Sequence, residues 1–329
     1  MKNFFLLLGA IKLCLCVLGS CSTGDAAMAA RMLGGSSQAL VFLNCKAVSQ
    51  DEIEFVFSRA VTVKNLNFDP ELSIASVENG STVRVKLAES PQPGRLITVD
   101  LLAEDERRNS INVLVTLRAR NDRMPNLVIN EICTEYASNT RKSEFIEFKM
   151  RSAGNLGAMR VVIVGNSNAS QKTIFEFSPV EVRNGDYVVL HLRTLEPASK
   201  DEYGSNLAES GGANSSPTAR DFWIPGNTKL LHKTAIVYVI DQDDRIINAV
   251  MISENPSSPW PRDFLAEAAD HVIANGAWNG NAVSSTGTTN TRTICRNETA
   301  VNTNSAADWY VTVTSGATPG RLNNPGRYQ

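Results

Sequence analysis

The stretch VINEICTEYASNTRKSEFIEF, residues 128–148, contains two short apolar runs that carry glutamates. Their valine, isoleucine and phenylalanine residues favour β-strands. Side chains alternate between the two faces of a regular strand, so we expect Glu131 on the face of Ile129 and Glu147 on the face of Phe145. Two carboxylates in neighbouring strands would form either an acid/base pair or part of a scaffold.

The same chain continues with further short strand-like runs and a characteristic ending. After Ile129-Asn130-Glu131 and Glu144-Phe145-Ile146-Glu147 come Asp308-Trp309 and then Thr318-Pro319-Gly320-Arg321-Leu322-Asn323. This order resembles the lamin-tail domain, an immunoglobulin-like β-sandwich found in nuclear lamins and in many exported bacterial proteins. The resemblance implies a lamin-tail-like domain over residues 122–326, with its acids satisfied by backbone amides or by a basic partner.

Two polar, loop-like segments make this domain long for that family. Residues 195–227 are rich in serine, glycine and asparagine, and residues 254–290 contain one short helical pattern. In the helix, Leu265, Ala268, Ala269, Val272 and Ile273 are expected to form one buried face, with Asn275-Gly276 as the stop. Trp260 and Trp278 flank the helix and are the candidate ligand-binding residues, with burial under the loops as the alternative.

The preceding residues predict a second β-domain. Turn signals, including Asn79-Gly80, separate five strand-like runs at residues 39–48, 52–61, 81–90, 95–104 and 111–120. The run DEIEFVFSRAV, residues 51–61, resembles the opening of immunoglobulin-like domains in bacterial surface proteins. The predicted fold class is therefore all-β, with two immunoglobulin-like β-sandwich domains in tandem, an Ig-like domain over residues 39–121 and the lamin-tail-like domain over residues 122–326.

The pattern of the first twenty residues is typical of an export signal. MKNFFLLLGAIKLCLCVLGSC has a basic start and an apolar run that is too short for a confident membrane span. Leu18-Gly19-Ser20-Cys21 resembles a bacterial lipobox, which implies a lipoprotein signal peptide at residues 1–20, cleavage before Cys21 and a lipid on its thiol. An ordinary signal with an incidental cysteine is the alternative. Residues 21–38 are expected to be a flexible tether.

Charge and cysteine content restrict the remaining classes of function. Removal of the signal leaves 30 basic and 34 acidic residues without a basic stripe, so nucleic acid is not an expected partner. Cys133 and Cys295 are either a disulfide or two small buried thiols. No cofactor or metal site is predicted, and DQDDR at residues 241–245 is interpreted as a hairpin turn.

Together these features predict a cell-envelope lipoprotein anchored in the membrane through Cys21, at the outer rather than the inner membrane. Its function is expected to be non-enzymatic, as a binding or structural module for an envelope or host protein or a glycan. The alternative is an exported hydrolase that uses the paired carboxylates Glu131 and Glu147. An open groove lined by both acids would favour the hydrolase, whereas carboxylates bonded to backbone amides would favour the scaffold.

Overall fold

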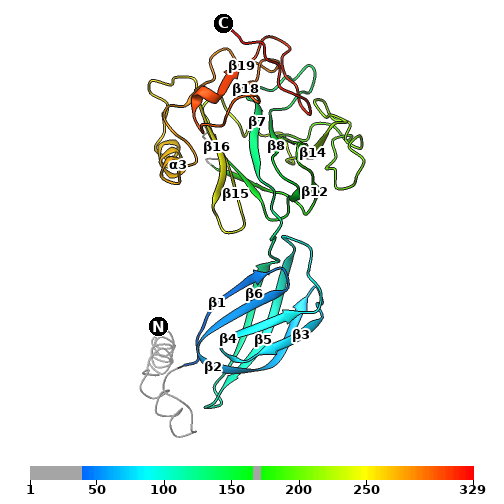
Figure 1. The fold of residues 1–329 in the computed structure, drawn as a ribbon, viewed down its shortest axis with the longest axis vertical. Helices are drawn as coiled ribbons and strands as arrows, with labels where there is room; N and C mark the ends of the chain where they lie inside the picture. The colour runs from blue at the N-terminus through cyan, green and yellow to red at the C-terminus, as the bar shows by residue number, and fades with distance from the viewer. Residues whose placement is uncertain (1–38, 166–171) are drawn as a thin grey trace, which may run out of the picture. The chain divides into compact units, whose positions relative to one another are not determined.

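The computed structural model describes residues 39–165 and 172–329, which form two compact units (Figure 1). The first unit comprises residues 39–91 and 96–119, and the second comprises residues 92–95 and 120–329. Both are built mainly of β-strands, and the second also contains a short α-helix. Within these two described ranges, no helix is long and apolar enough to span a membrane. Cys21, with the predicted signal peptide and tether, lies outside the described residues.

The first unit is a six-stranded antiparallel sheet in which alternate side chains are buried. The long strand β2 pairs with β1 and β4 through its first half and with β5 through its second half. Phe55, Val83 and Val99, from three neighbouring strands, are fully buried in its core. The strands are β1 (Phe42–Ser49), β2 (Glu52–Asp69), β3 (Ile74–Glu78), β4 (Gly80–Leu87), β5 (Leu96–Asp105) and β6 (Ser110–Arg118).

Each of the five runs predicted for this unit overlaps an observed strand. The hairpin signal at Asn79-Gly80 is also confirmed, because β3 and β4 pair on either side of it, starting from Glu78 and Arg84. Strand β3 itself was missed, since its residues are almost all exposed and give no clear alternation.

The second unit contains two larger sheets that share one apolar core, and a small two-stranded sheet of β9 and β12. The larger sheets have the orders β11-β10-β15-β16-β17 and β14-β13-β8-β7-β18-β19, and each is mixed, with one parallel pair. The strands are β7 (Leu127–Cys133), β8 (Phe145–Met150), β9 (Gly154–Asn155), β10 (Arg160–Gly165), β11 (Thr173–Glu176), β12 (Glu181–Val182), β13 (Tyr187–His191), β14 (Ala219–Trp223), β15 (Ala235–Ile240), β16 (Ile246–Ser253), β17 (Val283–Ser284), β18 (Ile294–Arg296) and β19 (Trp309–Val311).

The predicted helix is present as α3 (Asp263–Ala274) (Figure 1), and it packs beside β15 and β10. Leu265, Ala269 and Val272 are buried, as expected, and the left-handed backbone at Gly276 follows the end of the helix. The prediction was wrong for Ile273, which is 45% exposed because only one narrow stripe of the helix faces the core. A single turn of 3-10 helix, η1 (Ala306–Asp308), precedes β19.

A β-bulge at Asn130 changes the face on which Glu131 lies. Ile129 pairs with Phe148, whereas Glu131 pairs with Glu147, so Asn130 is an extra residue in β7. The expectation that Ile129 and Glu131 share a face was therefore wrong. Ile129 and Phe148 point into the main core, and the two glutamates point to the opposite face of the sheet.

The strand register places Glu131 and Glu147 in one row of side chains across the six-stranded sheet of the second unit. The side chains on the opposite face, among them Ile132, Ile146 and Leu190, pack into the main core. The polar face is covered by residues 318–323, here called the C-terminal segment, whose amides reach the glutamates. The row consists of Asp221, Val189, Glu147, Glu131, Cys295 and Tyr310.

Candidate functional site

Glu131 lies fully buried in β7 and accepts hydrogen bonds with both carboxylate oxygens. Thr293 Oγ1 donates to Oε1 at 2.5 Å, and the Thr318 amide lies 3.1 Å from each oxygen. The Thr318 hydroxyl adds a further bond to Oε2 at 3.2 Å. Burial raises the pKa of Glu131, and the hydrogen bonds from Thr293 and Thr318 oppose that rise by stabilising the charged form.

Glu147 is the cross-strand neighbour of Glu131 and is also fully buried. Asn130 Nδ2 donates to its Oε1 at 2.8 Å, and the Gly320 amide donates to its Oε2 at 2.6 Å. Burial raises the pKa of Glu147 well above the ordinary value, and the adjacent Glu131 raises it further. The pair therefore takes up protons at a higher pH than exposed glutamates do.

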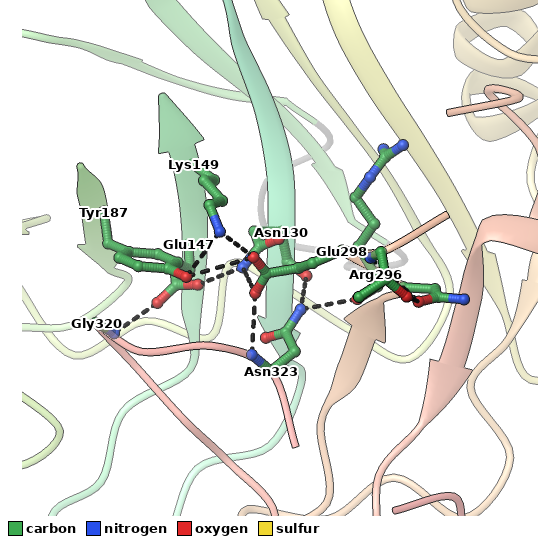
Figure 2. Close-up of polar contacts among 10 residues, drawn as sticks. Asn130, Glu147, Lys149, Tyr187, Arg296, Glu298, Gly320 and Asn323 are labelled. Carbon is green, nitrogen blue, oxygen red and sulfur yellow. Dashed lines mark hydrogen bonds and ion pairs between the residues drawn. The ribbon is translucent and has the colours of Figure 1, made fainter. Parts of the chain in front are cut away.

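A third carboxylate, Glu298, lies with Glu147 around Asn130 (Figure 2). Together with Glu131, the cross-strand neighbour of Glu147, these acids form what we call the carboxylate cluster of Glu131, Glu147 and Glu298. Glu298 forms an ion pair with Lys149 and accepts the Asn323 amide at 2.9 Å. Burial alone would raise the pKa of Glu298, but the bonds from Lys149, Asn323 and Asn130 outweigh it and lower that pKa. The cluster thus contains one ionised acid with a basic partner, beside two acids for which the described part of the chain provides no basic partner.

Asn130 and Asn323 connect the acids to the backbone. Asn130 Nδ2 lies between Glu147 and Glu298, at 2.8 and 3.1 Å from their Oε1 atoms. Asn323 Nδ2 donates to the carbonyl oxygens of Asn130 and Arg296, at 3.0 and 2.9 Å (Figure 2). The bulge in β7 is therefore bonded on one side to the cluster and on the other to the C-terminal segment.

The cluster binds the C-terminal segment at three points, the amides of Thr318, Gly320 and Asn323. Gly320 has φ +75°, a left-handed conformation that favours glycine, and a Cβ atom there would lie only 2.7 Å from Ser216 Cβ. Both the backbone conformation and the steric contact therefore require glycine at this position. Thr318, Gly320 and Asn323 are the residues of the ending noted in the sequence. The acids of the opening stretch and this ending are thus two halves of one hydrogen-bonded arrangement.

This arrangement restricts the chemistry of the two candidate catalytic acids. A general acid or nucleophile needs a carboxylate oxygen within reach of a substrate. All four oxygens of Glu131 and Glu147 already accept bonds from the chain, and neither side chain is exposed. Among residues 39–165 and 172–329, no three histidine, cysteine, aspartate or glutamate side chains are grouped as metal ligands.

The third acid of the opening stretch, Glu144, belongs to a separate buried ion pair. Its two oxygens accept bonds from Arg193 Nε and Nη2 at 2.7 and 2.6 Å, in a bidentate geometry. The Arg193 guanidinium also lies over the Tyr136 ring, 4.6 Å from its centroid. Sequence reasoning missed Arg193, as it missed Lys149 and Glu298, because no local pattern links these residues to their partners.

The other candidate residues contribute to packing in this structure. Trp278 is 2% exposed and donates its indole N–H to the Asn281 carbonyl, while Trp260 is partly buried against the main core. Cys133 and Cys295 are buried free thiols. Each sulfur lies near a separate oxygen, that of the Glu135 carbonyl for Cys133 and that of the Thr293 hydroxyl for Cys295.

Comparison with known proteins places the second unit in a family. A protein of Treponema pallidum (strain Nichols), named "Uncharacterized protein", is 26% identical over 216 residues, which cover 62% of this chain and 53% of that protein. The chain therefore spans about half the length of this relative. Among solved structures, a DUF4876 family protein from Bacteroides thetaiotaomicron has a TM-score of 0.34 and 13% identity, over 87% of this chain and 99% of that one. The N-terminal part of the bacterial S-layer protein SbsC has a TM-score of 0.25 and 14% identity, over 46% of this chain and 40% of that one.

A family model described as a protein second domain, TP_1001_2nd, matches residues 125–311. The matched residues include the whole carboxylate cluster and end before the C-terminal segment. Because the match covers more than half of the chain, the protein belongs to the TP_1001_2nd second-domain family.

Proposed function

We propose that this protein is a cell-envelope lipoprotein, anchored in the outer membrane through a lipid on Cys21, whose β-units form a non-enzymatic binding or structural module. In this proposal the first unit is an immunoglobulin-like sandwich and the second a lamin-tail-like one. The lipobox-like sequence before Cys21 supports the anchor. The sequence order that ends in Thr318-Pro319-Gly320 and Asn323 supports the lamin-tail likeness.

The observation that carries the non-enzymatic proposal is the bonding of the paired acids. Glu131 and Glu147 are held by the amides of Thr318 and Gly320, which is the arrangement expected of a scaffold. A hydrolase that used this pair would have to detach the C-terminal segment before either acid could reach a substrate. The geometry therefore favours a structural role for these acids over the alternative of an exported hydrolase.

The organisation of the 195–227 segment supports a binding role for the second unit. The buried Glu202 carboxylate accepts the amides of Glu209, Ser210 and Asp221 at 2.9–3.1 Å. Asp221 in turn bonds His191 Nε2 at 2.8 Å and the Ser216 amide at 3.0 Å. Because these bonds already fix the long loop, its outer side chains would lose little conformational entropy when a ligand binds, which favours binding.

Metabolic labelling with a fatty-acid analogue tests the anchor. We expect label on the wild-type chain and on Cys16→Ser, because residue 16 lies in the part removed with the signal, and no label on Cys21→Ser. Label that persists on Cys21→Ser would contradict the lipobox interpretation.

The non-enzymatic role is tested with glycoside, ester and phosphoester substrates. We expect the wild-type protein and Glu147→Gln to give the same background rate. Turnover by the wild-type protein that is lost in a folded Glu147→Gln variant would establish the hydrolase instead.

A further inference from the structure

A pocket of about 670 Å³ opens on the second unit, and all of its lining residues belong to that unit. Its walls come from residues 92–93, from β9, from residues 179–186 including β12, and from the 195–227 segment including β14. This volume is within the range of small-molecule sites. The side chains that decide its chemistry are Glu181, Arg183, Asp186, Tyr203 and Arg220.

The two acids of the pocket are already engaged by the protein. Glu181 forms an ion pair with Arg123 and accepts Asn155 Nδ2 at 2.9 Å, and these bonds lower its pKa. Asp186 Oδ2 accepts the Arg183 amide at 2.7 Å. The negative charges that line the pocket are therefore partly neutralised or used to fix the turn.

The two arginines of the pocket keep donors available for a ligand. Arg220 Nη1 donates to the carbonyl oxygens of Glu202 and Gly204 at 2.6 and 2.7 Å, which fixes the guanidinium plane. Its Nε and Nη2 have no hydrogen-bond partner among the described residues, and neither is a buried unpaired atom. Within the same residues, the exposed Arg183 guanidinium likewise forms no ion pair. The free Nε–Nη2 edge of an arginine matches a carboxylate in bidentate geometry.

Tyr203 places an aromatic ring at the same pocket. The residue is 57% exposed, although its hydroxyl donates to Asp201 Oδ2 at 2.9 Å. The Phe222 ring supports it edge-on, with centroids 6.2 Å apart. The ring is held by the hydrogen bond of its hydroxyl group and by its contact with Phe222. It therefore offers a flat apolar surface that loses little conformational entropy when a ligand binds. The C–H face of a sugar ring packs on such a surface.

We propose that this pocket binds an acidic saccharide, with the sugar carboxylate held by Arg220 and Arg183 and the sugar ring packed on Tyr203. The inference rests on the proposed binding function and specifies its ligand class. A neutral sugar would leave the Nε–Nη2 edge of Arg220 and the Arg183 guanidinium unused, and a simple anion would leave the tyrosine ring unused. The combination of fixed arginine, second positive charge and exposed ring favours a ligand that has both features.

The test is a ligand-observed NMR titration of the full-length protein in detergent with galacturonic acid, galactose and inorganic phosphate. Galacturonic acid differs from galactose only by the carboxylate at C6, so the pair isolates the contribution of the arginines. We expect galacturonic acid to bind and galactose to bind at least about tenfold more weakly, as for the loss of a charged hydrogen bond. Phosphate should compete only weakly, because it cannot pack on Tyr203.

Variants identify the site. Arg183→Gln and Arg220→Gln should each weaken galacturonic acid binding by about tenfold, and Arg183 is exposed, so its replacement leaves the fold intact. Tyr203→Ala should abolish binding, whereas Tyr203→Phe keeps the ring and should retain it. Arg245→Gln removes one exposed charge outside the pocket and should have no effect.

Three results would overturn the saccharide site. They are equal binding of galactose and galacturonic acid, wild-type affinity in both arginine variants, and absence of galacturonic acid binding in the millimolar range. Phosphate that competes fully, together with an unaffected Tyr203→Ala variant, would reduce the pocket to a simple anion site. If any of these outcomes is found while Cys21 is still labelled, the saccharide site is rejected and the proposal of a lipid-anchored module is not. The two proposals can therefore be rejected independently.

Discussion

At the scale of single residues, Glu147 gives the second unit a distinct pH dependence. Its pKa is raised in the folded state, so folding binds a proton that the unfolded chain holds less tightly. The resulting stability is fully present below the ordinary glutamate pKa and is lost as the pH rises through the folded value. We therefore expect the free energy of unfolding to fall as the pH rises above the ordinary glutamate pKa, and to fall less steeply in Glu147→Gln.

Denaturation followed by tryptophan fluorescence measures this effect, because all four tryptophans lie in the second unit. Glu181→Gln is the matched control, since the pKa of Glu181 is lowered and its contribution is lost only as the pH falls. Identical slopes for the wild-type protein and Glu147→Gln would show that Glu147 has no raised pKa.

Gly320 provides a second residue-scale prediction with a matched control. Gly320→Ala adds a Cβ atom that collides with Ser216 at a positive φ, whereas Gly185→Ala adds one at φ +89° with no atom within 4 Å. We expect Gly185→Ala to cost about 1 kcal/mol from the backbone alone, and Gly320→Ala to cost about 2–4 kcal/mol because overpacking adds to it. Equal losses in urea denaturation would mean that the C-terminal segment moves aside without cost.

Sequence could identify some of these residues but not their partners. Glu131 and Glu147 stand out because charged residues in apolar strands require an explanation. Their donors, the amides of Thr318 and Gly320, lie 187 and 173 residues further along the chain. No periodicity or local spacing encodes contacts at that separation, and only the family resemblance placed the two segments in one domain.

At the scale of elements, strand β7 shows why the alternation rule failed locally. Val128, Ile129 and Ile132 are apolar and β7 is buried on both faces, so no clean alternation marks either face and the pattern cannot reveal a shift in register. The bulge at Asn130 is stabilised by Asn323 and Glu298, which are distant in sequence. Short helices are easier to predict, because the signals for α3 and its stop are local.

The C-terminal segment acts as an element that closes the polar face of the six-stranded sheet. A stop codon at Thr318 would remove the amide donors that the C-terminal segment provides to Glu131, Glu147 and Glu298. The loss of a hydrogen bond to a buried carboxylate costs about 1–3 kcal/mol, and three such acids are affected, so we expect the second unit to lose more than about 3 kcal/mol of stability. A stop after Arg327 keeps all three donors and is the control. Similar fluorescence midpoints for the two truncated chains would contradict the proposed closure.

At the scale of the whole molecule, composition and periodicity were enough to predict a mostly β protein. The pairing order within each sheet was not predictable, because β14 and β17 pair in parallel with the preceding strands β13 and β16 across long connections. The long segments 195–227 and 254–290, expected to be insertions, contribute these two strands. Their short lengths and polar surroundings gave no strand signal.

The anchor gives a prediction for the whole molecule. We expect the wild-type chain to sediment with outer-membrane vesicles. We expect Cys21→Ser to leave the membrane fraction, because a chain without acyl groups has no hydrophobic anchor in the bilayer. Cys45→Ser, which changes a cysteine in the first unit, should remain with the membrane. Density-gradient fractionation with immunoblotting distinguishes these outcomes, and sedimentation of Cys21→Ser with the vesicles would contradict the anchor.

The separation between the carboxylate cluster and the C-terminal segment also sets an order of events during biogenesis. A chain synthesised from its N-terminus presents Glu131 and Glu147 long before Thr318 and Gly320 emerge. Until then these glutamates have no amide donors from the segment, and water is the natural partner for their charge. The polar face of the six-stranded sheet in the second unit can therefore exclude water only after nearly two hundred further residues have been synthesised. We expect the final folding of the second unit to be a late, slow step.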